Sequence, residues 1–369
     1  MLTQEENERL TRVGPGTPMG ELLRRYWHPV AVSSQFKDHG TKPVRILGED
    51  LVLFRDRGGS LGLIGDRCQH RRAGMVFGIP EQDGLRCAYH GWMYNAAGQC
   101  IEQPYESTED PGSAFKDKIT IKAYPVSELG GLIFAYLGPE PVPVLPRWDI
   151  YVMDGVVRDI GSGVVPCNWL QIMDNSMDPI HVEWLHQRFT DYVFEHLGRP
   201  RRRVVREGER DERGWRHVKI GFTVFEHGIT KRRVLEGGSE EDEDWTIGHP
   251  VVFPNILRTP NAFQIRVPVD DTHTWHVWYS TYAPKPDSVE QTPETIPYFE
   301  VPIPRCLEPA SRTGLCWITT AARTSPSGTR KAGSPTARRS TSGALTEGWS
   351  STARYSNSRW RSRCVATIQ

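Results

Sequence analysis

The chain has 369 residues, and its 45 Lys and Arg residues balance its 45 Asp and Glu residues. This balance gives no overall field that would attract nucleic acid or an anionic membrane surface, and no apolar run reaches the roughly 18 residues of a membrane span. The length predicts two or three domains. A polar N-terminus and seven cysteines favour a cytoplasmic protein with free thiols over a disulfide-bonded secreted one.

The N-terminal part is predicted to begin with a helical segment, residues 1–35, that includes a helix at residues 21–26 and leads into a β-rich region. Stretches of branched and aromatic residues then recur at short intervals, separated by Gly-containing turns, at residues 43–47, 51–54 and 61–64. This spacing predicts a small antiparallel β domain over residues 36–140.

Two short motifs in this β domain each contain one cysteine and one histidine. Cys68-Gln-His70 is followed, after sixteen residues, by Cys87-Ala-Tyr-His90. A Rieske [2Fe-2S] cluster uses two thiolates on one iron and two imidazoles on the other, so these four residues are its predicted ligands. A zinc site is the alternative, although zinc fingers usually separate a Cys pair from a His pair.

The second half is predicted to be a separate domain over residues 150–303. Residues 141–149, at the end of a Pro-rich stretch, are the expected linker. A helical patch at residues 168–189 precedes long stretches rich in aromatic and branched residues, which are typical of strands. The pattern predicts an α+β fold in which an antiparallel sheet packs against helices.

The helical patch carries a second candidate metal site at His181 and His186. Histidines five residues apart point about 140° away from each other on an ideal α-helix, so one metal ion can bind both only if the segment departs from that geometry. Two histidines and a carboxylate form the facial triad that holds mononuclear Fe(II). A pair of core or interface histidines is the alternative, and the Cys/His motifs upstream favour the metal. Asp178, before Pro179, is also expected to cap a helix.

Three segments together resemble the N-terminal Rieske domain of ring-hydroxylating oxygenase α subunits. They are RYWHPV at residues 25–30, the CQHR and CAYHGW motifs, and YPV with GGLIF at residues 124–134. The first 29 residues are most similar to the phthalate 4,5-dioxygenase group, and the resemblance extends to about residue 303. It implies that the second domain is a helix-grip (START-like) catalytic domain.

The resemblance also implies a function. The chain would be a terminal oxygenase component that uses O2 and Fe(II) to hydroxylate an aromatic acid, as a homotrimer, with electrons from a separate flavin and iron–sulfur reductase. Asp178 would hydrogen-bond the iron-bound His181 and reach His90 of a neighbouring subunit, as a catalytic bridge between the metals. Alternatives are an oxidative demethylase or monooxygenase with the same metals, a Rieske electron carrier, and an inactive relic.

The last segment, residues 304–369, departs from the family. It contains no Asp and no His from residue 305 onward, so the late Asp that is the third iron ligand in the family is missing. Its Ser-, Thr- and Arg-rich composition predicts an unstructured, low-complexity tail. A reading-frame change near residues 303–312 is our explanation, and a divergent disordered tail is the rival. The chain is therefore expected to bind the cluster but to hold Fe(II) weakly.

Overall fold

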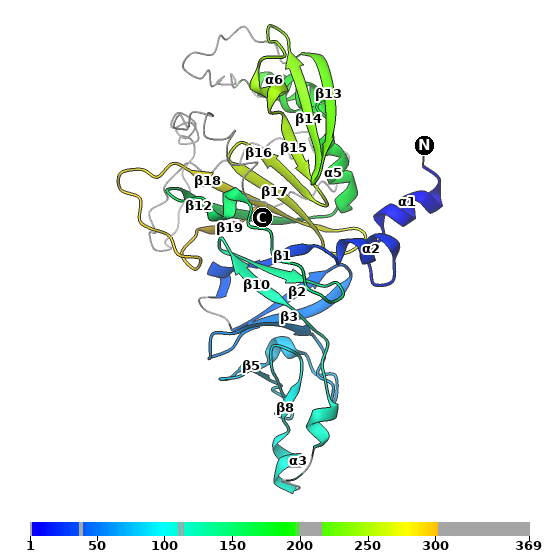
Figure 1. The fold of residues 1–369 in the computed structure, drawn as a ribbon, viewed down its shortest axis with the longest axis vertical. Coiled ribbons are helices and arrows are strands. Elements are labelled where there is room, and N and C mark those ends of the chain that lie inside the picture. Colours follow the sequence, from blue (N-terminus) through cyan, green and yellow to red (C-terminus); the bar gives the residue numbers. More distant parts are fainter. Residues whose placement is uncertain are drawn as a thin grey trace.

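The structure is a computed structural model that describes residues 2–36, 40–109, 112, 114–196, 198 and 216–301. The predicted tail, the suggested frame change and any third iron ligand in that tail lie outside the described residues. The described part is an elongated α+β molecule with small sheets at one end and a large sheet towards the other (Figure 1).

The N-terminal segment contains two short helices and a strand. Thr3 and Glu6 form a reciprocal capping box at the start of α1 (Gln4–Thr11), and Thr17 caps α2 (Pro18–Leu23). Strand β1 (Trp27–Val32) follows, so the segment predicted as helical over residues 1–35 is only partly so. The branched and aromatic residues of β1 explain the difference, because such side chains pack well in a sheet.

Three small sheets make up the predicted Rieske domain. One consists of β1, β11 (Leu132–Tyr136) and β10 (Val126–Leu129). The second consists of β2 (Thr41–Ile46), β3 (Glu49–Arg55), β4 (Leu61–Gly65) and β9 (Ala123–Tyr124). The third consists of β5 (Ile79–Pro80), β6 (Leu85–Arg86), β7 (Met93–Tyr94) and β8 (Cys100–Glu102). Short helices connect them: η1 (Ser33–Phe36), η2 (Met75–Phe77), α3 (Pro104–Glu109) and η3 (Phe115–Lys118).

Eight of the described strands form one large sheet. In spatial order they are β13 (His217–Phe225), β14 (Gly228–Leu235), β15 (His249–Val252), β16 (Ile256–Thr259), β17 (Ala262–Pro268), β18 (Thr274–Tyr282), β12 (Val157–Val165) and β19 (Tyr298–Glu300). All neighbours are antiparallel except β12 and β19. Residues 251–257, one of the branched stretches that the sequence pattern predicts to be a strand, instead form a hairpin of β15 and β16, because Pro254 cannot donate a ladder hydrogen bond.

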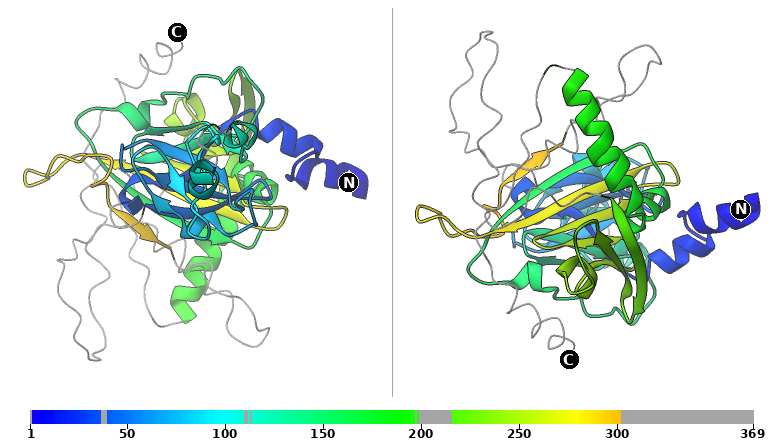
Figure 2. Two further views of the ribbon diagram at one scale, coloured as in Figure 1. Left: turned by 90° about the horizontal axis from the view of Figure 1, so that it is seen from below. Right: turned by 90° about the horizontal axis from the view of Figure 1, so that it is seen from above.

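The helical patch crosses one face of this sheet (Figure 2). It consists of α5 (Trp169–Met177), which lies against β16 and β17, a π-helix η4 (Val182–Phe189), and α6 (Thr190–His196). Two further short helices are α4 (Asp149–Val152) and α7 (Glu243–Thr246). A large antiparallel sheet with a helical segment packed on one face agrees with the helix-grip fold expected for the second domain.

The two halves share one hydrophobic core. Buried residues of β3 and β4 and of β17 and β18 belong to the same cluster. The hydroxyl of Tyr279 donates to the carbonyl of Gly130 at 2.7 Å, and the N–H of Leu47 donates to the carbonyl of Pro268 at 2.9 Å. Residues 137–148, which include most of the expected linker, have no regular secondary structure. No described helix combines the length and apolar character needed to cross a bilayer.

Candidate functional site

The two Cys/His motifs adopt the same backbone turn. The carbonyl of Cys68 accepts a hydrogen bond from Arg72 at 2.9 Å, and that of Cys87 accepts one from Gly91 at 3.0 Å. Each cysteine N–H donates to the carbonyl five residues later. The turn closes with positive φ, 60° at Arg72 and 78° at Gly91, a conformation that glycine adopts without strain. Two short segments that are separate in sequence therefore hold their Cys and His side chains on the same type of turn.

The four predicted cluster ligands converge, and the two cysteines are buried whereas the two histidines are exposed. Cys68 is 1% exposed and Cys87 3%, and burial raises the pKa of the Cys68 thiol, which the adjoining Cys87 raises further. The rings of His70 and His90 are exposed, with centroids 4.7 Å apart. Two buried thiols beside two exposed imidazoles fit a dinuclear cluster that has two sulfur and two nitrogen ligands.

Two aromatic side chains surround these donors. The ring of Trp92 stacks on His70 with centroids 4.7 Å apart and 13° between the planes. The hydroxyl of Tyr94 accepts a hydrogen bond from the N–H of Gln69 at 3.2 Å and lies 3.4 Å from the Sγ of Cys68. Because that oxygen already accepts from the backbone, its proton is free to point at sulfur. Both aromatics are buried core residues as well.

Arg86 supports the second turn, and our sequence analysis missed it. Its guanidinium donates to the carbonyl of Gly91 at 2.7 Å and contacts the carboxylates of Glu81 and Glu102, each at 2.5 Å. Its position directly before Cys87 was the available signal. Glu102 lies on β8 and Glu81 directly follows β5, and a linear motif does not reveal that they meet at Arg86.

The π-helix brings His181 and His186 together. Their ring centroids lie 5.1 Å apart at an interplanar angle of 69°. Since a π-helix is closed by hydrogen bonds between residues five apart, residues i and i+5 lie on one face instead of diverging. The departure from α-helical geometry that the spacing required is therefore present. Burial lowers the pKa of His181, although Asp178 opposes the shift, and a neutral imidazole is the form that binds metal.

Asp178 both caps a turn and contacts the first histidine. Its carboxylate accepts from the N–H of Ile180 at 2.7 Å and of His181 at 3.3 Å, and it lies 3.5 Å from the Nδ1 of His181. The amide of Asn175 lies 3.5 Å from the other ring nitrogen of His181. A carboxylate in this position orients the ring and raises its basicity.

The segments that carry the two sets of donors lie towards opposite ends of the molecule, the small sheet of β5 to β8 at one end and α5 and α6, which flank the π-helix, towards the other (Figure 1). Within the described residues, no three His, Cys, Asp or Glu side chains form a group that holds a single ion. A dinuclear cluster needs only two protein ligands per iron, so Cys68, His70, Cys87 and His90 are sufficient for it. The His181–His186 pair supplies two ligands of a triad.

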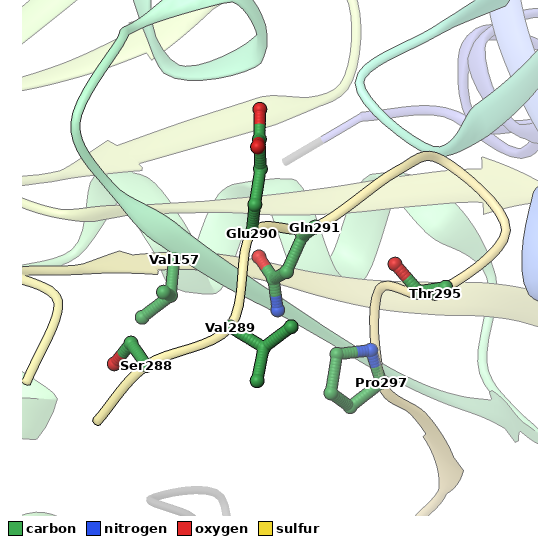
Figure 3. Close-up of a pocket in the computed structure, with 7 residues that line it drawn as sticks. All are labelled: Val157, Ser288, Val289, Glu290, Gln291, Thr295 and Pro297. Atoms are coloured by element: carbon green, nitrogen blue, oxygen red, sulfur yellow. The ribbon is translucent and has the colours of Figure 1, made fainter.

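A pocket of about 390 Å³ opens between the start of β12 and the segment before β19 (Figure 3). It is lined by Val157, Ser288, Val289, Glu290, Gln291, Thr295 and Pro297. The amide of Gln291 is already used, because it pairs with the backbone N–H and carbonyl of Arg158 at 2.6 and 2.9 Å. None of the predicted ligands lines this pocket.

Comparisons with known proteins agree with this geometry. Residues 26–125 match the Rieske [2Fe-2S] domain family. The chain is 47% identical to the 5,5'-dehydrodivanillate O-demethylase oxygenase subunit of Sphingobium sp. (strain NBRC 103272 / SYK-6), over 82% of this chain and 68% of that protein. It is 33% identical to the phthalate 4,5-dioxygenase oxygenase subunit of Pseudomonas putida, over 80% and 66%. Among solved structures, Pseudomonas putida CBB5 NdmA matches 73% of this chain and 76% of its own, with a TM-score of 0.53 at 20% identity, and supports the fold alone.

Proposed function

This chain belongs to the Rieske non-haem iron oxygenases, and from that membership we propose that it is the terminal component of a system that oxidises a small aromatic acid with O2. The resemblance to the phthalate 4,5-dioxygenase group is confirmed. The family carries a Rieske [2Fe-2S] cluster and a mononuclear Fe(II). The observation that supports the proposal best is the presence, in one chain, of a converging Cys2His2 set and a histidine pair held by a π-helix.

Named side chains would hold each metal. Cys68, His70, Cys87 and His90 would hold the cluster, and His181 and His186 would bind Fe(II). When bound, the cluster supplies single electrons and Fe(II) offers open positions for O2. The protein contributes position and shielding, since Trp92 stacks on His70 and the carboxylate of Asp178 lies 3.5 Å from the Nδ1 of His181.

The assembly is proposed to be a homotrimer. The two predicted metal sites of one chain are far apart, which favours electron transfer from His90 of one subunit to Asp178 of a neighbour. Asp178 is suited to such a bridge because 47% of its side chain is exposed. Light scattering during gel filtration should give three times the chain mass of 41.9 kDa. A monomer that retains full activity would contradict the trimer.

Oxidative O-demethylation is a second candidate reaction, because the relative with 47% identity is named as an O-demethylase. Hydroxylation and demethylation use the same metals and differ in how the substrate is placed. Electrons would come from a separate flavin and iron–sulfur reductase. We keep the cytoplasm as the predicted compartment on the basis of cysteine usage.

The test is a substrate panel of benzoate, phthalate and aryl-ether acids, supplied with NADH, a flavin and iron–sulfur reductase and O2. Fe(II) is added in excess, because the chain is expected to hold this iron weakly. A hydroxylated product supports the first reaction, and formaldehyde with a phenol supports the second. A Rieske electron carrier would accept electrons and form neither product. If the purified protein is colourless and its dithionite-reduced EPR spectrum lacks the low average g of a Rieske centre, the proposal is wrong.

A further inference from the structure

Three basic side chains of the large sheet are buried. Lys231 is 9% exposed, Arg266 2% and His276 8%. None of the ion pairs between described residues includes Lys231 or Arg266, whereas the buried Arg258 lies 3.0 Å from the carboxylate of Asp149. Burying a cation without an anion is costly, so Lys231 and Arg266 need an explanation.

The strand register places all three on the same face of the sheet. A row of directly opposed residues runs across five strands: Ile229, Val251, Leu257, Gln264 and Trp278. Lys231, Arg266 and His276 each lie two residues from a member of this row, and side chains two apart share a face. Arg266 and His276 are themselves directly opposed.

Two of these side chains have donor atoms without a partner. Arg266 uses its terminal nitrogens on the carbonyl and side-chain oxygen of Gln264, at 2.7 and 2.8 Å, but its buried Nε has no partner among the described residues. The Nε2 of His276 is likewise buried and unpartnered, and its ring stacks on Trp278 with centroids 4.1 Å apart. Burial lowers the pKa of Arg266 to about 9 and, with help from Arg233, that of Lys231 to about 8. An anion at this face would reverse both shifts.

This face adjoins the predicted iron ligands. The ammonium of Lys231 donates to the carbonyl of Ser176 at 2.6 Å, two residues before Asp178. Lys231 and Asp178 interact electrostatically, and Lys231 also lowers the pKa of His181. Lys231 uses one of its three protons on Ser176 and retains two for a ligand.

We propose that Lys231, Arg266 and His276 form an anion-binding subsite that receives the carboxylate of the aromatic substrate beside the His181–His186 pair. The inference rests on the proposed function and adds the side chains that select an acid over a neutral analogue. Lys231 and the Nε of Arg266 would donate to the carboxylate oxygens, and Trp278 would offer an apolar ring surface nearby. A neutral ester fits less well, because it leaves buried cations unpaired.

The experiment measures binding of acids and of their methyl esters to the full chain by calorimetry. Benzoate, phthalate and 3-methoxybenzoate are each compared with the corresponding methyl ester. We expect at least one acid to bind about 10-fold or more tightly than its ester, since a hydrogen bond to a charged group has roughly this effect. Equal affinity for every acid and its ester would overturn the proposal.

Variants then assign the preference to these residues. Lys231→Met and Arg266→Gln should each weaken acid binding about 10- to 100-fold and leave ester binding unchanged. Lys219→Met is the matched control, because this lysine lies on the neighbouring strand β13, is half exposed and pairs with Glu240. Thermal melts separate the subsite from a structural role. Removing an unpaired buried cation should preserve or raise Tm, and a lower Tm with unchanged acid preference would contradict us.

Turnover distinguishes this inference from the proposed function. If acid and ester are oxidised equally well, the oxygenase function stands and the subsite is wrong. If the acid binds through Lys231 and Arg266 but no product forms with reductase, O2 and added Fe(II), the subsite stands and the proposed function is wrong.

Discussion

The hydroxyl of Tyr94 lies 3.4 Å from the Cys68 sulfur, within hydrogen-bonding distance. Burial raises the pKa of Tyr94 far above its usual range, so the group stays protonated. Tyr94→Phe should lower the midpoint potential of the cluster by about 65 mV, because one hydrogen bond to a charged group is worth roughly 1.5 kcal/mol. An EPR-monitored redox titration measures the shift. Tyr136→Phe, which removes a hydroxyl bonded to the carbonyl of Pro139, should leave the potential unchanged.

Individual site residues could be predicted from the sequence where metal binding requires particular side chains at a short spacing. The donors Cys68, His70, Cys87 and His90 were predicted together because a mixed sulfur and imidazole set is rare. Arg86 was not predicted, since its partners are brought close only by the pairing of β-strands. The cations Lys231 and Arg266 were missed for the same reason.

The π-helix is the element on which the second metal site depends. Glu183, which is 6% exposed, links the π-helix to β13, because its carboxylate accepts from the backbone N–H of His217 at 3.0 Å and lies 3.3 Å from the Nδ1 of that residue. The same carboxylate lies 3.3 Å from the guanidinium of Arg188. Glu183→Gln should lower Tm by a few degrees and speed the loss of Fe(II) to a chelator, while the EPR signal of the cluster is unchanged. Glu195→Gln, exposed on α6, is the control. Unaltered iron retention in Glu183→Gln would contradict this role.

Element types were predictable where the pattern was long, as for β17 and β18, and less so where one residue divides a stretch. Pro254 turns an expected strand into the β15–β16 hairpin. The need for a distorted helix followed from the spacing of His181 and His186, but not the kind of distortion. A π-helix depends on contacts such as that between Glu183 and His217, which are distant in sequence.

The two halves of the molecule meet beside Asp270, and this carboxylate should make the stability of the protein sensitive to acid. Burial raises the pKa of Asp270, but hydrogen bonds from Thr272 and His273 outweigh it and bring the pKa to about 2, and Asp270 also lies 3.5 Å from Arg45. A carboxylate whose pKa is depressed in the folded state stabilises it above the unfolded pKa of about 4, and this contribution is lost as pH falls towards 2.

Melting curves between pH 6 and pH 3 measure this effect. The Tm of the wild-type protein should fall more steeply with acid than that of Asp270→Asn. Asp117→Asn, whose carboxylate is 65% exposed, should follow the wild-type curve. If Asp270→Asn also follows it, the carboxylate has no such role.

The iron content of the chain tests the prediction about its C-terminal segment. With two ligands from the described residues and no Asp from residue 305 onward, the chain should retain the two irons of the cluster and lose most of the third on gel filtration. Iron quantitation and EPR measure both. Three tightly bound irons per chain would contradict it, and restoring the reading frame should restore the third iron.

In the proposed trimer, the separation between the exposed His70–His90 tip and the His181–His186 pair predicts that damage in one subunit can be compensated by another. Cys87→Ser should prevent assembly of the cluster in its own chain. Asp178→Asn should block electron transfer into the iron site of its own chain. Each variant alone should be nearly inactive, whereas subunits unfolded together and reassembled should regain part of the wild-type rate. Complementation of this kind would show that the electron passes from the cluster of one subunit to the iron site of another, and not within a single chain.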